Sequence, residues 1–511
     1  MKHSGVVVAV VVVSVLILPL VPPGGTSPVQ AQVAASAAPS APQAAAALGL
    51  GYQWHTFYGV ADSVGQLRTV GVDGAGNVYV AGHISRTWGS PLHEHSGGYD
   101  AVVIKLNGLG AYQWHTFYGA SPTESEDGDD EAVGIAVDAA GNVYVAGYSD
   151  RTWQGPGDTG PLNPHTGTEN MVVLKLDSAG AYQWHTFYQP GRANAIALDG
   201  AGNVLITGYS AFEWGTPLHS AADTGHLVVL KLDGNGAYQW HTYYGGDVGA
   251  GDEAGYGVAT DSASNVYVTG TATYPWLGDG GAAPLSPFSG GEGYSTDIAI
   301  LKLGANGAYQ WHTFAGADGT DDLNNGIAWR AGSLVVVGQS ANTWGAPLNP
   351  HAGETDIAVL QLSGNGQRQW NTFYGSTASD VGSSVSIKAD GSIYVSGSSA
   401  ASWLGDDGAS PSHPYSGTGG ADIVVLKLDG SGRYRRHTFY GDADTHDYGF
   451  GIAVDNNYAL FIPGTSESTW PGDGGIAPLH PHSGNLDGDG FVLKLDDWIH
   501  RIYIPLIIRG Q

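Results

Sequence analysis

The sequence contains no cysteine and few basic residues. With no cysteine among its 511 residues, disulfide bonds and a lipid-modified N-terminal cysteine are both excluded. Lysine and arginine together number 19 against 47 aspartates and glutamates, which gives a formal net charge of −28. So acidic a chain repels nucleic acids and anionic membranes at long range. Cations, neutral glycans and basic proteins remain open as partner classes.

Long apolar runs are also scarce. The run from Val6 to Leu20 follows a single lysine, contains Pro19 and precedes a small-residue site that ends at Ala31. It is short for a membrane span, so we expect residues 1–31 to form a secretory signal peptide, with an uncleaved anchor as the alternative. Residues 32–49 are rich in alanine and proline, which predicts a flexible lead-in.

No stretch of the chain shows a helical pattern, and a repeated strand motif is prominent instead. The motif QWHTFYG occurs at Gln53–Gly59 and Gln113–Gly119, at Gln239–Gly245 with one Phe-to-Tyr change, and in decayed forms elsewhere. Seven copies are present, and a fixed period of this kind indicates a repeat architecture.

Two further motifs keep phase with the first. NVYVAG at Asn77–Gly82 and DAVVIKL at Asp100–Leu106 recur in each unit, as does an inner GIAVD-like segment. Each unit therefore predicts four strands rich in Val, Ile, Tyr and Trp. The middle strands do not alternate apolar with polar residues, so both faces of each sheet must be covered. We predict an all-β fold, a seven-bladed β-propeller of four-stranded antiparallel blades over residues 50–496.

The two ends of the repeat region complete each other. The region begins with a lone outer strand at Tyr52–Gly59 and ends with Phe491–Leu495, which has no following partner. We expect the N-terminal strand to complete the last blade and to close the ring.

The long loops after the second strands carry a recurring tryptophan. Two interpretations are open: each indole fills the gap between neighbouring blades, or the indoles form a ring of platforms for sugar or peptide binding. Because the loops lie at one end of the blades, any ligand is expected there. The candidate ligand-binding residues are Trp88, Trp153, Trp214, Trp276, Trp344, Trp403 and Trp470.

Acidic residues gather in the connections between blades. We expect them around the mouth of the axial channel, either as solvated charges or as a calcium site, because flexible oxygen-rich loops suit calcium. Calcium is the only cofactor that we consider. The candidate metal ligands are Glu126, Asp127, Asp129, Asp130, Asp252, Glu253, Asp321, Asp322, Asp444 and Asp447.

Histidine recurs at one position of the outer strand, as in His55 and His115, but symmetry would spread these copies around the perimeter. A shared zinc site is therefore not expected, and we expect neutral imidazoles with local hydrogen bonds. No serine elbow, cysteine nucleophile or phosphate-binding glycine loop has the strand and helix context that it needs. The sequence thus predicts a protein that is not an enzyme.

The repeats resemble the SBBP family of bacterial β-propeller repeats over residues 52–496. The resemblance rests on the GNxYVxG strand, at Gly76–Gly82 and Gly141–Gly147, and on the D-x-x-x-x-KL strand, at Asp100–Leu106 and Asp422–Leu428. It implies exported or surface proteins and brings no catalytic residue.

We therefore expect a secreted or cell-surface bacterial protein, a monomer that acts as a noncatalytic binding or adhesion scaffold for an extracellular protein or glycan. The alternatives are a carbohydrate-binding lectin that uses the loop tryptophans and, less favoured, a glycan-active enzyme. After signal cleavage no membrane span is expected. The apolar tail at residues 497–511 is too short to cross a bilayer and is expected to dock on the propeller or to serve in surface retention.

Overall fold

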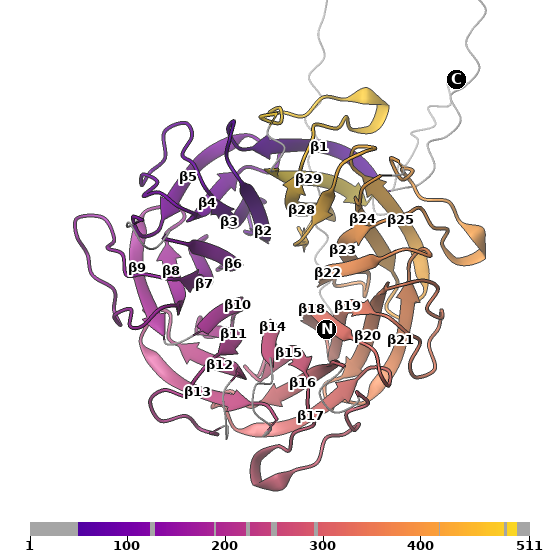
Figure 1. Ribbon diagram of the computed structural model, residues 1–511, viewed down its shortest axis with the longest axis horizontal. Coiled ribbons are helices and arrows are strands. Elements are labelled where there is room, and N and C mark those ends of the chain that lie inside the picture. Colours follow the sequence, from indigo (N-terminus) through magenta and orange to yellow (C-terminus); the bar gives the residue numbers. More distant parts are fainter. Residues whose placement is uncertain are drawn as a thin grey trace, which may run out of the picture. The chain divides into compact units, whose positions relative to one another are not determined.

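The computed structural model describes residues 50–122, 128–188, 191–220, 225–246, 253–290, 295–417, 419–484 and 488–497. Within these ranges the strands form seven antiparallel sheets around a common axis (Figure 1). The prediction of a seven-bladed propeller is confirmed. The predicted signal peptide, the lead-in and residues 498–511 of the tail lie outside the described residues.

In blades 1 to 6 the four strands follow one another from the axis to the rim, so each blade is a meander. The strands of blades 1 to 3 are β2 (Gly65–Val72), β3 (Val78–Ile84), β4 (Asp100–Leu106) and β5 (Tyr112–Tyr118); β6 (Asp130–Val137), β7 (Val143–Ser149), β8 (Asn170–Leu176) and β9 (Tyr182–Tyr188); and β10 (Gly191–Leu198), β11 (Val204–Ser210), β12 (His226–Leu232) and β13 (Tyr238–Tyr244).

Blades 4 to 7 repeat this order, and in blade 7 the inner strand is split in two. Their strands are β14 (Ala254–Thr260), β15 (Val266–Ala272), β16 (Asp297–Leu303) and β17 (Tyr309–Ala315); β18 (Asp322–Arg330), β19 (Ser333–Ser340), β20 (Asp356–Ser363) and β21 (Arg368–Tyr374); β22 (Asp380–Ile387), β23 (Ile393–Ser399), β24 (Asp422–Leu428) and β25 (Tyr434–Tyr440); and β26 (Asp447–Gly449), β27 (Ala453–Val454), β28 (Ala459–Ser466), β29 (Asp489–Asp497) and β1 (Leu50–Tyr58).

The described helices are three short 3-10 turns in the loops of blades 4, 6 and 7: η1 (Asp279–Gly281), η2 (Asp406–Gly408) and η3 (Asp473–Gly475). In the part of the chain that the structure describes, no helix has the length and hydropathy that a membrane crossing requires.

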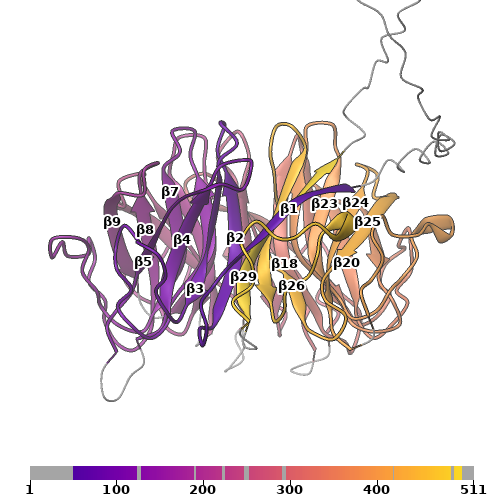
Figure 2. The same ribbon diagram turned by 90° about the horizontal axis from the view of Figure 1, so that it is seen from above.

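The core lies between the blades rather than within any one of them. Strand β3 is buried at all of its positions, which explains why its sequence does not alternate. One apolar cluster joins Val80 and Phe117 of blade 1 to Phe461 and Val492 of blade 7. Because the strands run from one face of the ring to the other (Figure 2), each blade covers a face of its neighbour.

The ring closes without a covalent bond. Strand β1 pairs antiparallel with β29, in a register that runs from Leu50 opposite Asp497 to Tyr58 opposite Gly490. Blade 7 therefore takes its outermost strand from the opposite end of the repeat region, as Figure 1 shows. The predicted closure is confirmed.

Candidate functional site

The inner strands carry a one-residue bulge at the same place in blades 1 to 6. In blade 1 the register shifts between Leu67 and Thr69, so Arg68 has no partner position on β3. In blade 7 the inner strand is interrupted between β26 and β27 at Phe450. The residues at these seven positions are Arg68, Val133, Asn194, Tyr256, Asn325, Ser383 and Phe450, and all of them line one cavity.

The cavity has a volume of about 500 Å³ and lies on the axis, because all seven blades contribute to its wall. The bulge also explains a glycine of the repeat. A side chain at Gly82 would collide with the carbonyl oxygen of Gln66, which the bulge pushes toward β3. Gly147 and Gly208 face the same obstacle in the next two blades. The invariant glycine of NVYVAG thus accommodates the bulge that turns a residue into the channel.

Among the described residues that line the channel, Arg68 is the one cationic group, and several others are neutral hydrogen-bonding groups. The Arg68 guanidinium lies 3.3 Å from the carboxylate of Glu131, and Nε of Arg68 has no hydrogen-bond partner among the described residues. Although burial opposes ionisation, the hydrogen bond from His83 and the charges of His83 and Arg68 lower the pKa of Glu131 to about 2. Asn194 and Asn325 each donate from Nδ2 to a backbone carbonyl of the next blade, at 2.9 Å.

At the rim, the long loops fold along the outer strands. In blade 1 the amide of Leu92 donates to the carbonyl of His115 at 2.9 Å, and the amide of Phe117 donates to the carbonyl of His93 at 3.2 Å. Equivalent pairs occur in all seven blades. In these segments the loop backbone covers the open edges of the outer strands. A ligand-binding role for the loops stays a prediction.

The recurring tryptophans pack at the blade junctions. The Trp470 indole stacks on the His55 imidazole at a centroid distance of 3.9 Å, and the centroid of the Tyr440 ring of blade 6 lies 6.0 Å from that of the indole. Nε2 of His55 donates to the carbonyl of Trp470 at 2.9 Å, while Nδ1 accepts from the Tyr52 hydroxyl at 2.7 Å. Burial lowers the pKa of His55 to about 4. At this junction the indole fills the gap between the blades, and the imidazole has the expected local hydrogen bonds, with a lowered pKa that favours its neutral form.

Facing carboxyl groups lie where one blade crosses to the next. Asp100 begins the third strand of blade 1, Asp130 begins the inner strand of blade 2, and both are buried. Gly119 passes between them: a Cβ atom added there would lie 2.5 Å from Oδ1 of Asp100 and 2.9 Å from Oδ2 of Asp130. The last glycine of QWHTFYG thus leaves room for a carboxyl pair. The same pairing recurs in Asp297 with Asp322, Asp356 with Asp380, and Asp422 with Asp447.

These carboxyl groups are engaged by the protein. Asp322 accepts hydrogen bonds from the amide of Ala317 at 2.7 Å and from the Ser340 hydroxyl. Burial and, to a lesser degree, the charge of the facing aspartate raise the pKa of Asp322 and of Asp380 to about 6. The same causes raise the pKa of Asp447 to about 7.

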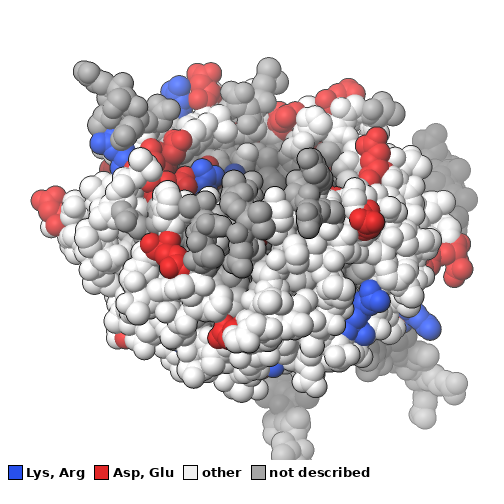
Figure 3. All heavy atoms as spheres, turned by 60° about the horizontal axis from the view of Figure 1, so that its bottom comes forward, with Lys and Arg blue, Asp and Glu red and all other residues white. Residues whose placement is uncertain are grey.

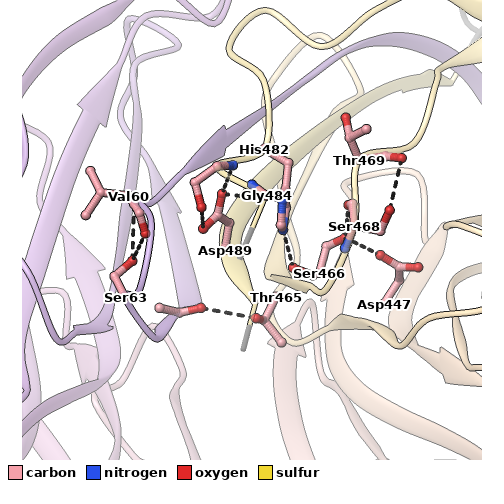
Figure 4. Close-up of polar contacts among 12 residues, drawn as sticks. Val60, Ser63, Asp447, Thr465, Ser466, Ser468, Thr469, His482, Gly484 and Asp489 are labelled. Carbon is pink, nitrogen blue, oxygen red and sulfur yellow. Dashed lines mark hydrogen bonds and ion pairs between the residues drawn. The ribbon is translucent and has the colours of Figure 1, made fainter. Parts of the chain in front are cut away.

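The seam between blades 7 and 1 departs from this pattern. Figure 4 shows Asp489 of β29 close to the turn of Val60 and Ser63. Gly65 stands at the position that Asp130 holds in blade 2, and in the turn before it the Ser63 hydroxyl donates to the carbonyl of Val60 at 2.7 Å. Asp489 accepts from the amide and the hydroxyl of Ser483, at 2.5 and 2.8 Å.

The SBBP beta-propeller repeat model matches the chain twice, at residues 113–151 and 239–273. The chain carries SBBP repeats. No curated protein matches the sequence significantly. The similar solved structures include the WD40 domain of Pan2 from Neurospora crassa, at 10% identity and a TM-score of 0.42, which covers 87% of this chain and 97% of that one.

Two other structural matches are equally remote. The WD40 beta-propeller domain of Doa1 is 9% identical with a TM-score of 0.44, and the match covers 88% of this chain and 97% of that one. A protein of unknown function from Dyadobacter fermentans is 9% identical with a TM-score of 0.40, over 88% of this chain and 99% of that one.

The loop indoles of the seven blades are covered to different degrees. Trp153, Trp276, Trp344, Trp403 and Trp470 are buried, so a ligand could not stack on them without displacing their neighbours. Trp88 and Trp214 are half-buried. A ring of seven indole platforms is therefore not formed, and a ligand-binding role stays a prediction for the last two alone.

The acidic candidates divide into three groups. Asp130, Glu253, Asp322 and Asp447 are buried at or beside the blade junctions instead of facing the channel mouth, which corrects the expectation for them. Asp129 is half-buried, while Asp321 and Asp444 are exposed. Glu126, Asp127 and Asp252 lie outside the described residues.

The described residues contain no group of three or more His, Asp or Glu side chains that could hold a metal ion. Calcium binding stays a prediction that these residues do not support. On the face in Figure 3 the acidic side chains are scattered rather than gathered into one patch.

Sequence reasoning missed the seven bulge residues and five members of the carboxyl pairs, namely Asp100, Asp297, Asp356, Asp380 and Asp422. A bulge adds a single residue to a short strand, so the repeat pattern of the sequence continues across it without interruption. The available signal was the invariant glycine on the second strand, which indicates a close backbone approach.

Proposed function

We propose that this protein is an exported, noncatalytic binding or adhesion scaffold that recognises its ligand in the axial channel. The observation that carries the proposal is a contrast inside the chain. The outer strand repeats almost unchanged, whereas the seven channel positions hold Arg, Val, Asn, Tyr, Asn, Ser and Phe. The same backbone bulge is present at this position of each inner strand in blades 1 to 6, so the variation of its side chain is where recognition of an asymmetric ligand is expected.

The chemistry of the channel favours binding. A guanidinium with an unpartnered Nε, two carboxamides, a phenol and a hydroxyl face the cavity from five blades. These groups donate and accept hydrogen bonds around a small polar molecule or the protruding end of an extracellular protein or glycan. Of the alternatives, a lectin that stacks sugars on the loop indoles is disfavoured by the burial of five of them, and a glycan-active enzyme has no observation in its favour.

The channel assignment predicts the effect of a triple serine variant. Arg68, Tyr256 and Phe450 are changed to serine, the residue that blade 6 already holds as Ser383 at this position. We expect ligand capture to fall by about tenfold or more, because hydrogen bonds and aromatic contact at the centre of the site are lost. The measurement compares small molecules, glycans and peptides from the native surroundings that elute from the immobilised full-length secreted protein and from the variant, by mass spectrometry.

The matched control is a triple serine variant at the exposed rim residues Gln113, Gln183 and Gln239. It should capture the same compounds as the parent. Equal capture by the channel variant, with its fold intact by circular dichroism, would exclude the channel as the recognition site.

Export is tested separately with the signal segment. Residues 1–31 fused to a reporter that is active only outside the cytoplasm should give extracellular activity, and the mature reporter should begin after Ala31 by N-terminal sequencing. A fusion that lacks residues 6–20 is the control, because it loses the apolar run. Retention of the unprocessed fusion would contradict the proposal.

A further inference from the structure

The rim loops differ in how they cover the tyrosine that begins the outer strand. In blades 2, 4, 6 and 7 the loop contains an extra turn, closed by an isolated bridge such as Gly155 with Thr159. This turn lies on the tyrosine ring: a Cβ atom added at Gly155 would lie 2.5 Å from Cζ of Tyr182. The contacts of Gly278 with Tyr309, Gly405 with Tyr434 and Gly472 with Tyr52 are equivalent. In four blades, therefore, a glycine presents its C–H groups to the ring.

Two of the remaining three blades leave this ring uncovered. Blades 1 and 3 have the shorter loop, and Tyr112 and Tyr238 are 45% and 44% exposed. Blade 5 also has the shorter loop, but Arg368 replaces the tyrosine, and its guanidinium occupies the space beside Gly345. In the same blade Asn371 replaces the histidine and donates to the Trp344 carbonyl at 3.0 Å, as the imidazole does elsewhere.

The two uncovered tyrosines lie in equivalent clefts of about 710 and 780 Å³. Each cleft is bounded by the loop of the preceding blade, the turn before the tyrosine and the loop tryptophan of its own blade. The leucines at the entrance are Leu479 in the first cleft and Leu162 in the second. The volumes suit a mono- or disaccharide-sized ligand.

The lining indicates what kind of molecule fits. No Lys, Arg, Asp or Glu is among the described residues that line either cleft, although the chain has a net charge of −28. Hydroxyl and carboxamide groups surround the aromatic floor, namely Thr56 and Ser90 in the first cleft and Asn163, Thr216 and Asn235 in the second. A neutral ligand with many hydroxyl groups and one flat C–H face matches this arrangement.

We propose that these two clefts each bind one neutral pyranose ring, which stacks on Tyr112 in blade 1 or on Tyr238 in blade 3. The sugar C–H groups take the place that the glycine C–H groups hold in blades 2, 4, 6 and 7. The sugar hydroxyls bond to the neutral polar groups around the ring. This site is distinct from the axial channel and uses tyrosine where the sequence pointed to tryptophan.

The test is titration of the full-length secreted protein with neutral mono- and oligosaccharides by calorimetry, after a glycan array has selected the best one. We expect two equivalent sites per chain. The closing variants copy blade 5: Tyr112→Arg with His115→Asn, and Tyr238→Arg with His241→Asn. Each should remove one site, and both together should weaken binding by tenfold or more, since the guanidinium fills the cleft.

The matched control keeps the aromatic ring of each tyrosine and removes only its hydroxyl group. The double variant Tyr112→Phe with Tyr238→Phe should retain both binding sites. Should a closing variant fail to fold, Ala111→Trp and Ala237→Trp block the clefts from exposed turn positions and carry the same expectation. The proposal is overturned if the array shows no neutral glycan bound, if blocked clefts bind as the parent does, or if only glycine- or proline-rich peptides bind. Because none of these changes touches the channel, the outcome is independent of the channel variant.

Discussion

Deleting residues 50–58 is expected to abolish the closed propeller. This strand buries Leu50, Tyr52, Trp54, Phe57 and Tyr58, and its backbone pairs with β29 along its whole length. Loss of five large buried side chains removes on the order of 10 kcal/mol of apolar burial. That is comparable with the whole stability of an ordinary domain, so the truncated chain should show no cooperative melting transition near that of the parent. Calorimetry and urea unfolding measure the effect.

The control truncation removes residues 32–49 only and keeps β1. Its transition should match that of the full chain, which separates the seam from a general effect of shortening the N-terminus. If both truncations melt at the same temperature, the seam does not hold the ring together.

Replacing Asp356 by asparagine is expected to flatten the pH dependence of stability. Asp356 faces Asp380 across Gly375, and its Oδ1 is buried without a hydrogen-bond partner. Asn170 already stands at the corresponding position of blade 2, where Oδ1 accepts from the Thr166 amide at 2.7 Å and Nδ2 donates to two carbonyls. The asparagine side chain thus directs an N–H group toward the carboxylate of Asp380.

The direction in which stability changes with pH follows from the raised pKa values of the paired aspartates. Burial and the charge of Asp356 raise the pKa of Asp380 from 3.8 to about 6. Its protonated form therefore stabilises the fold fully below pH 4, and this stabilisation is lost as the pH rises through 6. For one such group the change amounts to about 3 kcal/mol. With the facing charge removed, we expect the variant to equal the parent near pH 5 and to exceed it by about 1 to 2 kcal/mol at pH 8.

The buried histidines have the opposite effect on the pH dependence of folding stability. Burial lowers the pKa of His55, His185, His312 and His437 to about 4, so their contribution is present above pH 6.5 and is lost as the pH falls toward 4. Parent and variant share these residues, so the difference between their urea unfolding curves at pH 5 to 8 isolates the carboxyl pair. Asp407→Asn, at an exposed position, is the control and should leave the profile unchanged. Parallel profiles for Asp356→Asn and the parent would refute the shared-charge account.

Some of the candidate site was within reach of the sequence. The position of each loop tryptophan follows from its spacing, and so does the neutral state of histidines that repeat around a ring. The burial of each tryptophan does not follow from its spacing: Trp88, Trp214 and Trp344 all stand in the shorter loop, yet Trp344 is buried and the other two are half-buried. The carboxyl pairs were hidden for a related reason: Asp100 and Asp130 belong to different blades and meet only across Gly119.

The sequence by itself determined the fold, the number of blades and the closure by β1. The motif recurs seven times in a constant order, so the repeat region begins with an outer strand that has no blade of its own and ends with a blade that lacks its outer strand. Only the tertiary structure decided which residues face the axis, which carboxyl groups meet and which tyrosines stay uncovered. These features depend on a one-residue bulge and on contacts between blades. The invariant glycine of the second strand marks the bulge, but nothing periodic along the chain tells which residues of different blades meet.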